Sequence, residues 1–216
     1  MKITGAIFDM DGTLLNSMDY WATASSEYLK GKGIEPFSDC DKCFLEDGVK
    51  IWYEKAVQMH GLTESYDDTL REIYIIMDKY YSTVVELKDG VLDMLTRLRD
   101  HGVKMCIASA TDREYVIKIL TRLGIIDFFS GIFTSKEVGL GKRFPLIYQK
   151  ATEFLGTDAD TTYVFEDAYY AISTCHKNGI KVVGVYDKNA YLPKEKIASI
   201  CDYYLDEDDR YYFDIE

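Results

Sequence analysis

Short apolar runs alternate with amphipathic segments over most of this sequence. The apolar runs occupy residues 3–8, 103–108, 131–134, 161–165 and 180–185, and each is typical of a buried strand. Between them, apolar side chains recur at helical spacing over residues 90–100, 112–123, 145–155 and 167–178. Strands that alternate with helices predict an α/β fold whose sheet is mostly parallel and is covered by helices on both faces.

Residues 18–82 break this alternation. Helical patterns cover Tyr20–Leu29, Ile51–Met59 and Leu70–Tyr81, and no clear strand pattern lies among them. A helical block of this size is too large for a simple crossover between two strands. We therefore expect a Rossmann-like α/β core formed by residues 1–16 and 83–216, with an inserted all-helical cap at residues 17–82.

Composition narrows the class of protein and its partners. Hydrophobic residues make up 47% of the 216 residues, which is enough for a packed core. The formal net charge of −12 and the lack of a Lys/Arg cluster argue against nucleic acid as a partner. No apolar run approaches the ~18 residues of a membrane helix, and no signal peptide is recognisable. We expect a soluble cytoplasmic protein that contacts no membrane and is a monomer or a weak homodimer.

The five cysteines are scattered along the chain, which is unlike a secreted disulfide framework. Cys40 and Cys43 form a single CxxC pair, and no second pair completes a zinc site of that kind. We therefore expect reduced cysteines and no structural metal at this pair.

Reactive side chains follow several predicted strands at the point where each strand ends, or lie in the next loop. The set comprises four carboxylates, one hydroxyl and one lysine: Asp9, Asp11, Ser109, Lys142, Glu166 and Asp167. Because the carboxyl ends of parallel strands meet at one edge of a sheet, we expect these groups to converge there. Taken singly, each has a plainer explanation as a helix cap, a turn residue or a surface lysine. Together they favour a functional site.

The chemistry of this cluster favours a metal-bound phosphate site. Two like charges about 4 Å apart repel by about 4 kcal/mol, so several carboxylates in one cleft take up protons or recruit a cation. Oxygen ligands suit Mg²⁺, and Lys142 and Ser109 add the positive charge and the donor that a phosphoryl group needs. The three histidines each lie near a predicted helix end, and no Gly-Lys-Ser/Thr phosphate loop is present. We therefore expect the nucleophile among the carboxylates.

Four motifs, in this order, resemble those of the haloacid dehalogenase-like hydrolases. The run Phe8–Leu14 is similar to their DxDGT signature, and Ser109, Lys142 and Phe165–Asp167 are similar to their second, third and fourth motifs. The helical insertion resembles the small cap of the subgroup that contains β-phosphoglucomutase and phosphoglycolate phosphatase. The resemblance covers nearly the whole chain.

The resemblance implies a role for each acidic position. Asp9 would be the nucleophile that forms an aspartyl-phosphate, and Asp11 would be the general acid and then the general base. Mg²⁺ would be held by Asp9, the backbone carbonyl of Asp11 and Asp167, with Glu166 nearby.

The resemblance also implies the phosphate contacts. Ser109, Ala110 and Lys142 would hold the phosphoryl oxygens, and Lys142 would also be a catalytic residue. The chain departs from the family near these positions, with Arg143 where Pro is frequent and Leu146 where Asp is frequent. We expect altered loop packing and a different pocket wall there.

Further departures concern the cap and the fourth motif. The usual Ser-x-x-Gly is replaced by Ala168–Ala171, and Trp21 stands where the mutase branch has a cap histidine. A cap arginine of that branch falls near Ile51, with Lys50 beside it. These differences favour a phosphatase over a mutase, and the presence of Asp11 argues against the metal-free dehalogenase branch.

The expected function is a Mg²⁺-dependent phosphatase for a small phosphorylated metabolite of the sugar or polyol phosphate class. Trp21 and Lys50 are candidate substrate contacts in the cap, together with Tyr20 and Trp52, although helix packing is the plainer explanation for each. One alternative is a phosphomutase, which would transfer the phosphoryl group to a second hydroxyl instead of water. An alternative of a different class is a phospho-acceptor regulatory protein without turnover.

Overall fold

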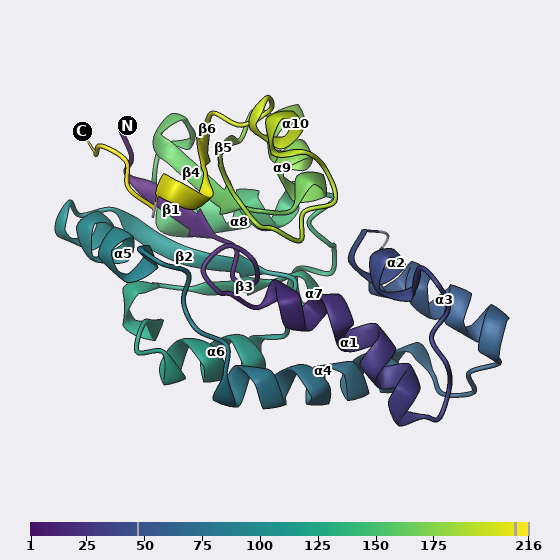
Figure 1. Ribbon diagram of the computed structural model, residues 1–216. Helices are drawn as coiled ribbons and strands as arrows, with labels where there is room; N and C mark the ends of the chain where they lie inside the picture. The colour runs from purple at the N-terminus through teal and green to yellow at the C-terminus, as the bar shows by residue number, and fades with distance from the viewer. Residues whose placement is uncertain (47, 210, 216) are drawn as a thin grey trace. The chain divides into compact units, whose positions relative to one another are not determined.

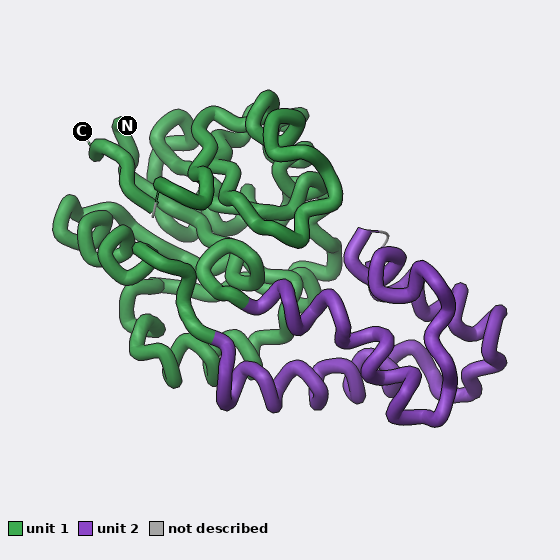
Figure 2. Tube along the Cα trace, viewed as in Figure 1, with its two compact units in different colours: residues 1–16, 86–216 green, residues 17–85 purple. Residues whose placement is uncertain are grey.

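A computed structural model describes residues 1–46, 48–209 and 211–215 (Figure 1). The chain forms two compact units (Figure 2). The first, the α/β unit, comprises Met1–Asn16 and Glu86–Glu216, and the second, the helical unit, comprises Ser17–Val85. The first break follows residue 16, where the sequence predicts a boundary. The second follows residue 85 instead of residue 82, because the last helix of the insertion continues to Thr83.

The α/β unit is built on a parallel sheet, as the sequence predicts. Among the described residues the strand order is β3-β2-β1-β4-β5-β6, and all of the pairings are parallel. The strands are β1 (Gly5–Phe8), β2 (Lys104–Ser109), β3 (Ile132–Thr134), β4 (Thr162–Glu166), β5 (Lys181–Val185) and β6 (Tyr203–Leu205). β6 has no counterpart among the predicted strands, because this short edge strand is partly exposed and has no continuous apolar run.

Helices cover both faces of the sheet. The helices of this unit are α5 (Val91–Asp100), α6 (Arg113–Arg122), α7 (Ser135–Val138), α8 (Leu146–Leu155), α9 (Tyr169–Lys177) and α10 (Lys194–Ala198). Figure 1 shows α8 and α9 on one side of the sheet and α5 and α6 on the other. On the first side, one hydrophobic cluster joins Ile7 and Val164 of the central strands to Tyr148 of α8 and Ile172 of α9. Such two-sided burial explains why the strands read as continuous apolar runs.

The helical unit contains α1 (Met18–Gly31), α2 (Cys40–Glu46), α3 (Val49–His60) and α4 (Tyr66–Thr83). The sequence predicts three of these helices and misses α2, which has seven residues and is too short for a clear period. Cys40 and Cys43 are buried in α2, and Cys40 Sγ accepts a hydrogen bond from Trp52 Nε1 at 3.2 Å. In the described ranges, no helix of either unit is both long and apolar enough to span a membrane.

The strand order brings three strand ends together. β1 pairs with β2 on one side and with β4 on the other. Phe8, the last residue of β1, is in register with Ile107 of β2 and Phe165 of β4. The next residue, Asp9, continues the pairing, since its N–H donates to the Phe165 carbonyl at 3.0 Å. The loops that follow β1, β2 and β4 therefore leave the sheet side by side.

Candidate active site

The loop after β1 is a tight turn held by backbone hydrogen bonds. The N–H groups of Leu14 and Leu15 both donate to the Met10 carbonyl, at 2.9 and 3.1 Å. Gly12 lies inside the turn with φ 80°, a left-handed conformation that glycine adopts without steric cost. The Leu14 carbonyl accepts the N–H of Lys88 at 2.9 Å, which ties the turn to the segment before α5. The Asp-x-Asp-Gly-Thr pattern thus produces a fixed loop at the sheet edge.

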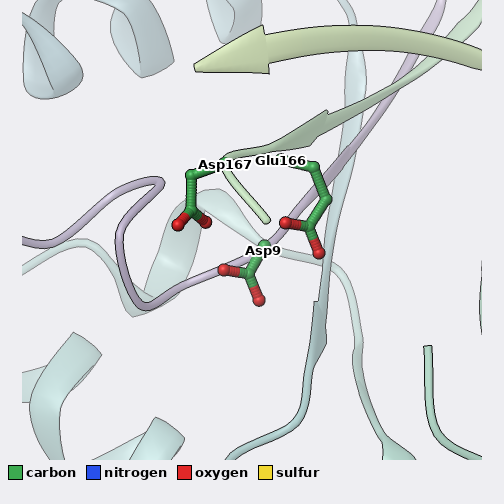
Figure 3. A group of neighbouring side chains, drawn as sticks. All are labelled: Asp9, Glu166 and Asp167. Carbon is green, nitrogen blue, oxygen red and sulfur yellow. The ribbon is translucent and has the colours of Figure 1, made fainter. Parts of the chain in front are cut away.

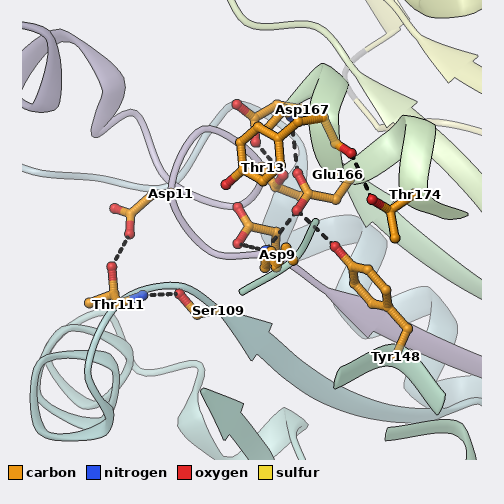
Figure 4. Close-up of polar contacts among 12 residues, drawn as sticks. Asp9, Asp11, Thr13, Ser109, Thr111, Tyr148, Glu166, Asp167 and Thr174 are labelled. Carbon is orange, nitrogen blue, oxygen red and sulfur yellow. Dashed lines mark hydrogen bonds and ion pairs between the residues drawn. The ribbon is translucent and has the colours of Figure 1, made fainter. Parts of the chain in front are cut away.

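Lys142 is the centre of a buried charge network. It lies between α7 and α8, and its Nζ forms ion pairs with Asp9 and, at 2.7 Å, with Glu166 Oε1. Glu166 Oε1 also accepts the Tyr148 hydroxyl at 3.3 Å, and Oε2 accepts the Ala168 N–H at 3.0 Å (Figure 4). Both oxygens of Glu166 are therefore engaged, and this carboxylate orients the ammonium group of Lys142 toward Asp9.

Three carboxylates gather beside that ammonium group. Figure 3 shows Asp9, Glu166 and Asp167 directed toward a common point at the ends of β1 and β4. One oxygen of each lies within 4.8 Å of the others, and all three residues are buried. Thr13 Oγ1 donates to Asp167 Oδ1 at 3.0 Å and holds that carboxylate in place. A set of oxygen ligands at this spacing fits a hard divalent cation.

Burial dominates the electrostatics of these groups. It raises the pKa of Asp9 from 3.8 to about 7, although Lys142 lowers that pKa, and Glu166 raises it further. Burial, Glu166 and Asp9 hold the pKa of Asp167 well above its usual range. Burial alone would lower the pKa of Lys142, but Asp9 and Glu166 outweigh it and raise that pKa. The lysine is therefore charged. Its single positive charge does not offset the burial of the carboxylates, and a bound cation would add the positive charge that favours their ionised form.

Asp11 is oriented differently from Asp9. Its Oδ2 accepts the Thr111 hydroxyl at 2.7 Å, and its carboxylate does not belong to the three-carboxylate group (Figure 4). The Thr111 N–H in turn donates to Ser109 Oγ at 3.0 Å. A hydroxyl oxygen that accepts a bond can still donate its own hydrogen, so Ser109 can also act as a donor to a ligand. Asp11 and Ser109 are thus linked through one residue of the loop after β2.

The strand ends bring the sequence-predicted residues of the α/β unit to one edge. Asp9, Lys142, Glu166 and Asp167 form its charged centre, while Asp11, Ser109 and the exposed Ala110 flank it.

The candidates from the helical unit have different surroundings. Trp21 is half-buried in α1, and its Nε1 donates to the Tyr81 hydroxyl at 3.0 Å. Lys50 is exposed in the first turn of α3. Tyr20 stacks on Tyr80 with ring centroids 4.5 Å apart. Trp52 is fully buried within the unit, so packing, and not substrate contact, explains it. A substrate contact by Trp21 or Lys50 remains a prediction.

Sequence reasoning missed several residues that support the site. Lys88 pairs with Asp187 at 3.0 Å, and both lie close enough to Asp167 to influence its pKa. Thr111 and Asp187 could have been found, because they lie three and two residues beyond the ends of predicted strands. No sequence pattern marks Tyr148 or Tyr211 as part of the site. Tyr148 belongs to the buried stripe of α8, and Tyr211 belongs to the segment after the last strand.

The fold and the site together define a class of protein. It is an α/β protein in which a buried carboxylate paired with a lysine, and an acidic cluster, lie at the carboxyl edge of a parallel sheet. The sequence model of the haloacid dehalogenase-like hydrolase family matches residues 6–185. The chain therefore belongs to the haloacid dehalogenase-like hydrolases.

Individual relatives agree with this assignment. The chain is 27% identical over 185 residues to validoxylamine A 7'-phosphate phosphatase of Streptomyces hygroscopicus subsp. limoneus, with 83% of this chain and 84% of that protein covered. It is 24% identical over 172 residues to hexitol phosphatase B of Escherichia coli strain K12, with 77% and 76% covered. It is also 25% identical over 188 residues to the chloroplastic protein SUPPRESSOR OF QUENCHING 1 of Arabidopsis thaliana, but spans only 18% of it.

A solved structure supports the fold. CbbY from Rhodobacter sphaeroides, in complex with phosphate, superimposes with a TM-score of 0.80 at 18% sequence identity. The match covers 94% of this chain and 93% of that one.

Proposed function

We propose that this protein is a Mg²⁺-dependent phosphatase that hydrolyses a small phosphorylated metabolite of the sugar or polyol phosphate class. The observation that carries the proposal is the position of Asp9. Its buried carboxylate is paired with Lys142 and lies within 4.8 Å of carboxylate oxygens of Glu166 and Asp167. A nucleophilic carboxylate needs such a site, where a developing negative charge meets fixed positive charge.

The proposed reaction has two balanced halves. In the first, an Asp9 oxygen attacks phosphorus, the bond between phosphorus and the ester oxygen breaks, and Asp11 donates a proton to the departing oxygen. In the second, Asp11 takes a proton from water, the water oxygen attacks phosphorus, and the bond to Asp9 breaks to release phosphate. Lys142 and Ser109 donate to the phosphoryl oxygens in both halves. Ala110, the next residue after Ser109, is the third residue of the proposed phosphate site.

The donor set fits Mg²⁺. Asp9 and Asp167 each offer a carboxylate oxygen, the backbone carbonyl of Asp11 follows in the same loop, and Glu166 lies nearby with its oxygens engaged by Lys142 and the Ala168 N–H. When bound, the ion would neutralise negative charge on the phosphoryl oxygens. It would also lower the pKa values of the carboxyl groups of Asp9 and Asp167, which burial and the neighbouring carboxylates raise.

The substrate class is proposed from the relatives and from the helical unit. The names of two relatives specify validoxylamine A 7'-phosphate and a hexitol phosphate as substrates. We propose that Trp21 and Lys50 of the helical unit contact the part of the substrate beyond the phosphate. A lysine there suits an anionic or hydroxyl-rich compound. Phosphatase activity is favoured over mutase activity because Trp21 and Ile51 stand where the mutase branch has histidine and arginine.

A panel of phosphorylated metabolites tests this function. Hexitol phosphates, sugar phosphates and an aryl phosphate are incubated with the protein and Mg²⁺, and released phosphate is measured. We expect release that depends on Mg²⁺ and falls at least about 1,000-fold in Asp9→Asn. The control is Asp93→Asn, the same change at an exposed position of α5. Full activity in excess chelator, or in Asp9→Asn, would contradict the proposal, and phosphate moved within the substrate would indicate a mutase.

A further inference from the structure

The end of the chain contacts the loop that carries Asp9 and Asp11. Tyr211 follows a short 3₁₀ turn, η3 (Glu207–Asp209), and is 6% exposed. Its hydroxyl donates to the backbone carbonyl of Thr13. Tyr211 lies outside the matched range 6–185, so this contact comes from a segment beyond the four family motifs.

Tyr211 is held in an unfavourable backbone conformation. In the ranges that the structure describes, it is the non-glycine residue with positive φ, at 58°. A bulky residue adopts this conformation only where surrounding contacts impose it. Such contacts lie two residues further along the chain, at Phe213. Its carbonyl accepts a hydrogen bond from Arg97 Nη2, and its ring centroid lies 5.9 Å from that of Phe165 in β4. Phe213, which follows Tyr211 in the chain, therefore anchors this segment on the sheet.

Thr13 connects Tyr211 to the acidic cluster. Its carbonyl accepts the Tyr211 hydroxyl, and its side chain donates to Asp167 Oδ1 at 3.0 Å. Thr13 is fully buried, so water does not replace either contact. Burial and the nearby Asp167 hold the pKa of Tyr211 well above its usual value, so the phenol keeps its proton and remains a donor.

We propose that Tyr211 is a positioning residue for the metal site, which fixes Thr13 and, through it, the orientation of Asp167. The inference rests on the proposed function, because it takes Asp167 as a Mg²⁺ ligand. Groups that orient a metal ligand change metal affinity by about 10- to 100-fold when they are removed. Tyr211 acts one residue further away, so we expect a smaller effect, about three- to tenfold.

Tyr211→Phe tests the proposal, because it removes the hydroxyl and retains the ring. Mg²⁺ affinity is measured by calorimetry on the substrate-free protein. We expect about three- to tenfold weaker binding, with kcat recovered at saturating Mg²⁺. The matched control is Tyr212→Phe, the same change at a side chain that is 66% exposed, and its affinity should equal that of the wild type. Equal affinities in the two variants would overturn the proposal.

A double-mutant cycle distinguishes positioning from a general loss of structure. Thr13→Val removes the hydrogen bond to Asp167 with little change of volume. If Tyr211 acts through Thr13, then Tyr211→Phe weakens Mg²⁺ binding in the wild type but not in the Thr13→Val background. An equal loss in both backgrounds would overturn this route.

Hydrogen exchange gives a measurement that does not depend on Mg²⁺. The amides of Leu14 and Leu15, which bond to the Met10 carbonyl, should exchange faster in Tyr211→Phe than in Tyr212→Phe. Faster exchange supports the positioning of the loop, and unchanged exchange contradicts it. A wild-type protein that binds no Mg²⁺ would refute the proposed function, and the exchange data would still decide whether Tyr211 fixes the loop.

Discussion

Lys142 Nζ lies 2.7 Å from Glu166 Oε1, and both side chains are almost completely removed from solvent. The same ammonium group pairs with Asp9, so one buried cation serves two buried carboxylates. An arrangement of this kind is costly to desolvate, and it persists only while its partners remain complete. The stability of the folded protein therefore depends on the same charged side chains that form the candidate active site.

Replacing Lys142 by methionine should destabilise the protein. The change leaves Asp9 and Glu166 buried without their ammonium partner, and breaking such a network costs about 3–5 kcal/mol. Denaturation by urea should show this loss at about pH 8 and a smaller loss at about pH 5, where protonation relieves the repulsion. Lys150→Met, at an exposed position of α8, should change the free energy of unfolding by less than about 0.5 kcal/mol. Equal effects of the two substitutions would contradict the network.

The metal-free protein should lose stability as the pH rises. The folded-state pKa of Asp9, about 7, lies above its ordinary 3.8, so the folded state retains a proton that the unfolded chain has released. This contribution is present below about pH 4 and disappears as the pH passes about 7, and Asp167 acts in the same direction. Melting temperatures in chelator should therefore decline between about pH 5 and about pH 8. Asp9→Asn should flatten this decline, and an identical slope in the variant would refute the assignment.

Mg²⁺ should stabilise the protein more at high pH than at low pH. Binding requires ionised carboxylates, so the ion competes with the protons of Asp9 and Asp167. At about 100 times its Kd, a ligand adds about 2.7 kcal/mol. We expect the shift in melting temperature caused by Mg²⁺ to be large at about pH 8 and small at about pH 5.5. Asp167→Asn should reduce the shift, and a shift independent of pH would speak against carboxylate ligands.

Thr111→Val should slow turnover without weakening substrate binding. The hydroxyl of Thr111 holds Asp11 Oδ2 at 2.7 Å, and valine has the same shape without the donor. Without this hydrogen bond Asp11 is less well oriented as general acid and base, so kcat should fall by about tenfold while KM changes little. Steady-state kinetics with an aryl phosphate measure this effect. Thr121→Val, at an exposed position of α6, serves as the control, and a rise in KM alone would argue for a substrate contact instead.

Lys50→Ala tests the proposed role of the helical unit. If Lys50 contacts the substrate, KM for a sugar or polyol phosphate should rise by about five- to tenfold, while turnover of an aryl phosphate stays the same. Lys30→Ala removes a similar exposed charge from α1 and should change neither value. If the two variants behave alike with every substrate, Lys50 is an ordinary surface residue.

Many strands and helices could be predicted from the sequence, because the pattern of apolar side chains within each segment decides them. The strands β1, β2, β4 and β5 are buried on both faces, so their apolar runs are continuous. The long helices of the α/β unit carry a clear apolar stripe. The elements α2 and β6 escaped prediction, because the seven residues of α2 are too few for a clear helical period and β6 is partly exposed, without a continuous apolar run.

The sequence alone determined which strand ends carry Asp9, Ser109 and Asp167, because strand boundaries and parallel topology follow from pattern and turn chemistry. Only the tertiary structure decided how the site is supported. Glu166 orients Lys142, Thr111 holds Asp11, and Tyr211 contacts Thr13 across 198 positions of sequence. Contacts of this kind leave no local periodicity, since they depend on which segments the completed fold brings together.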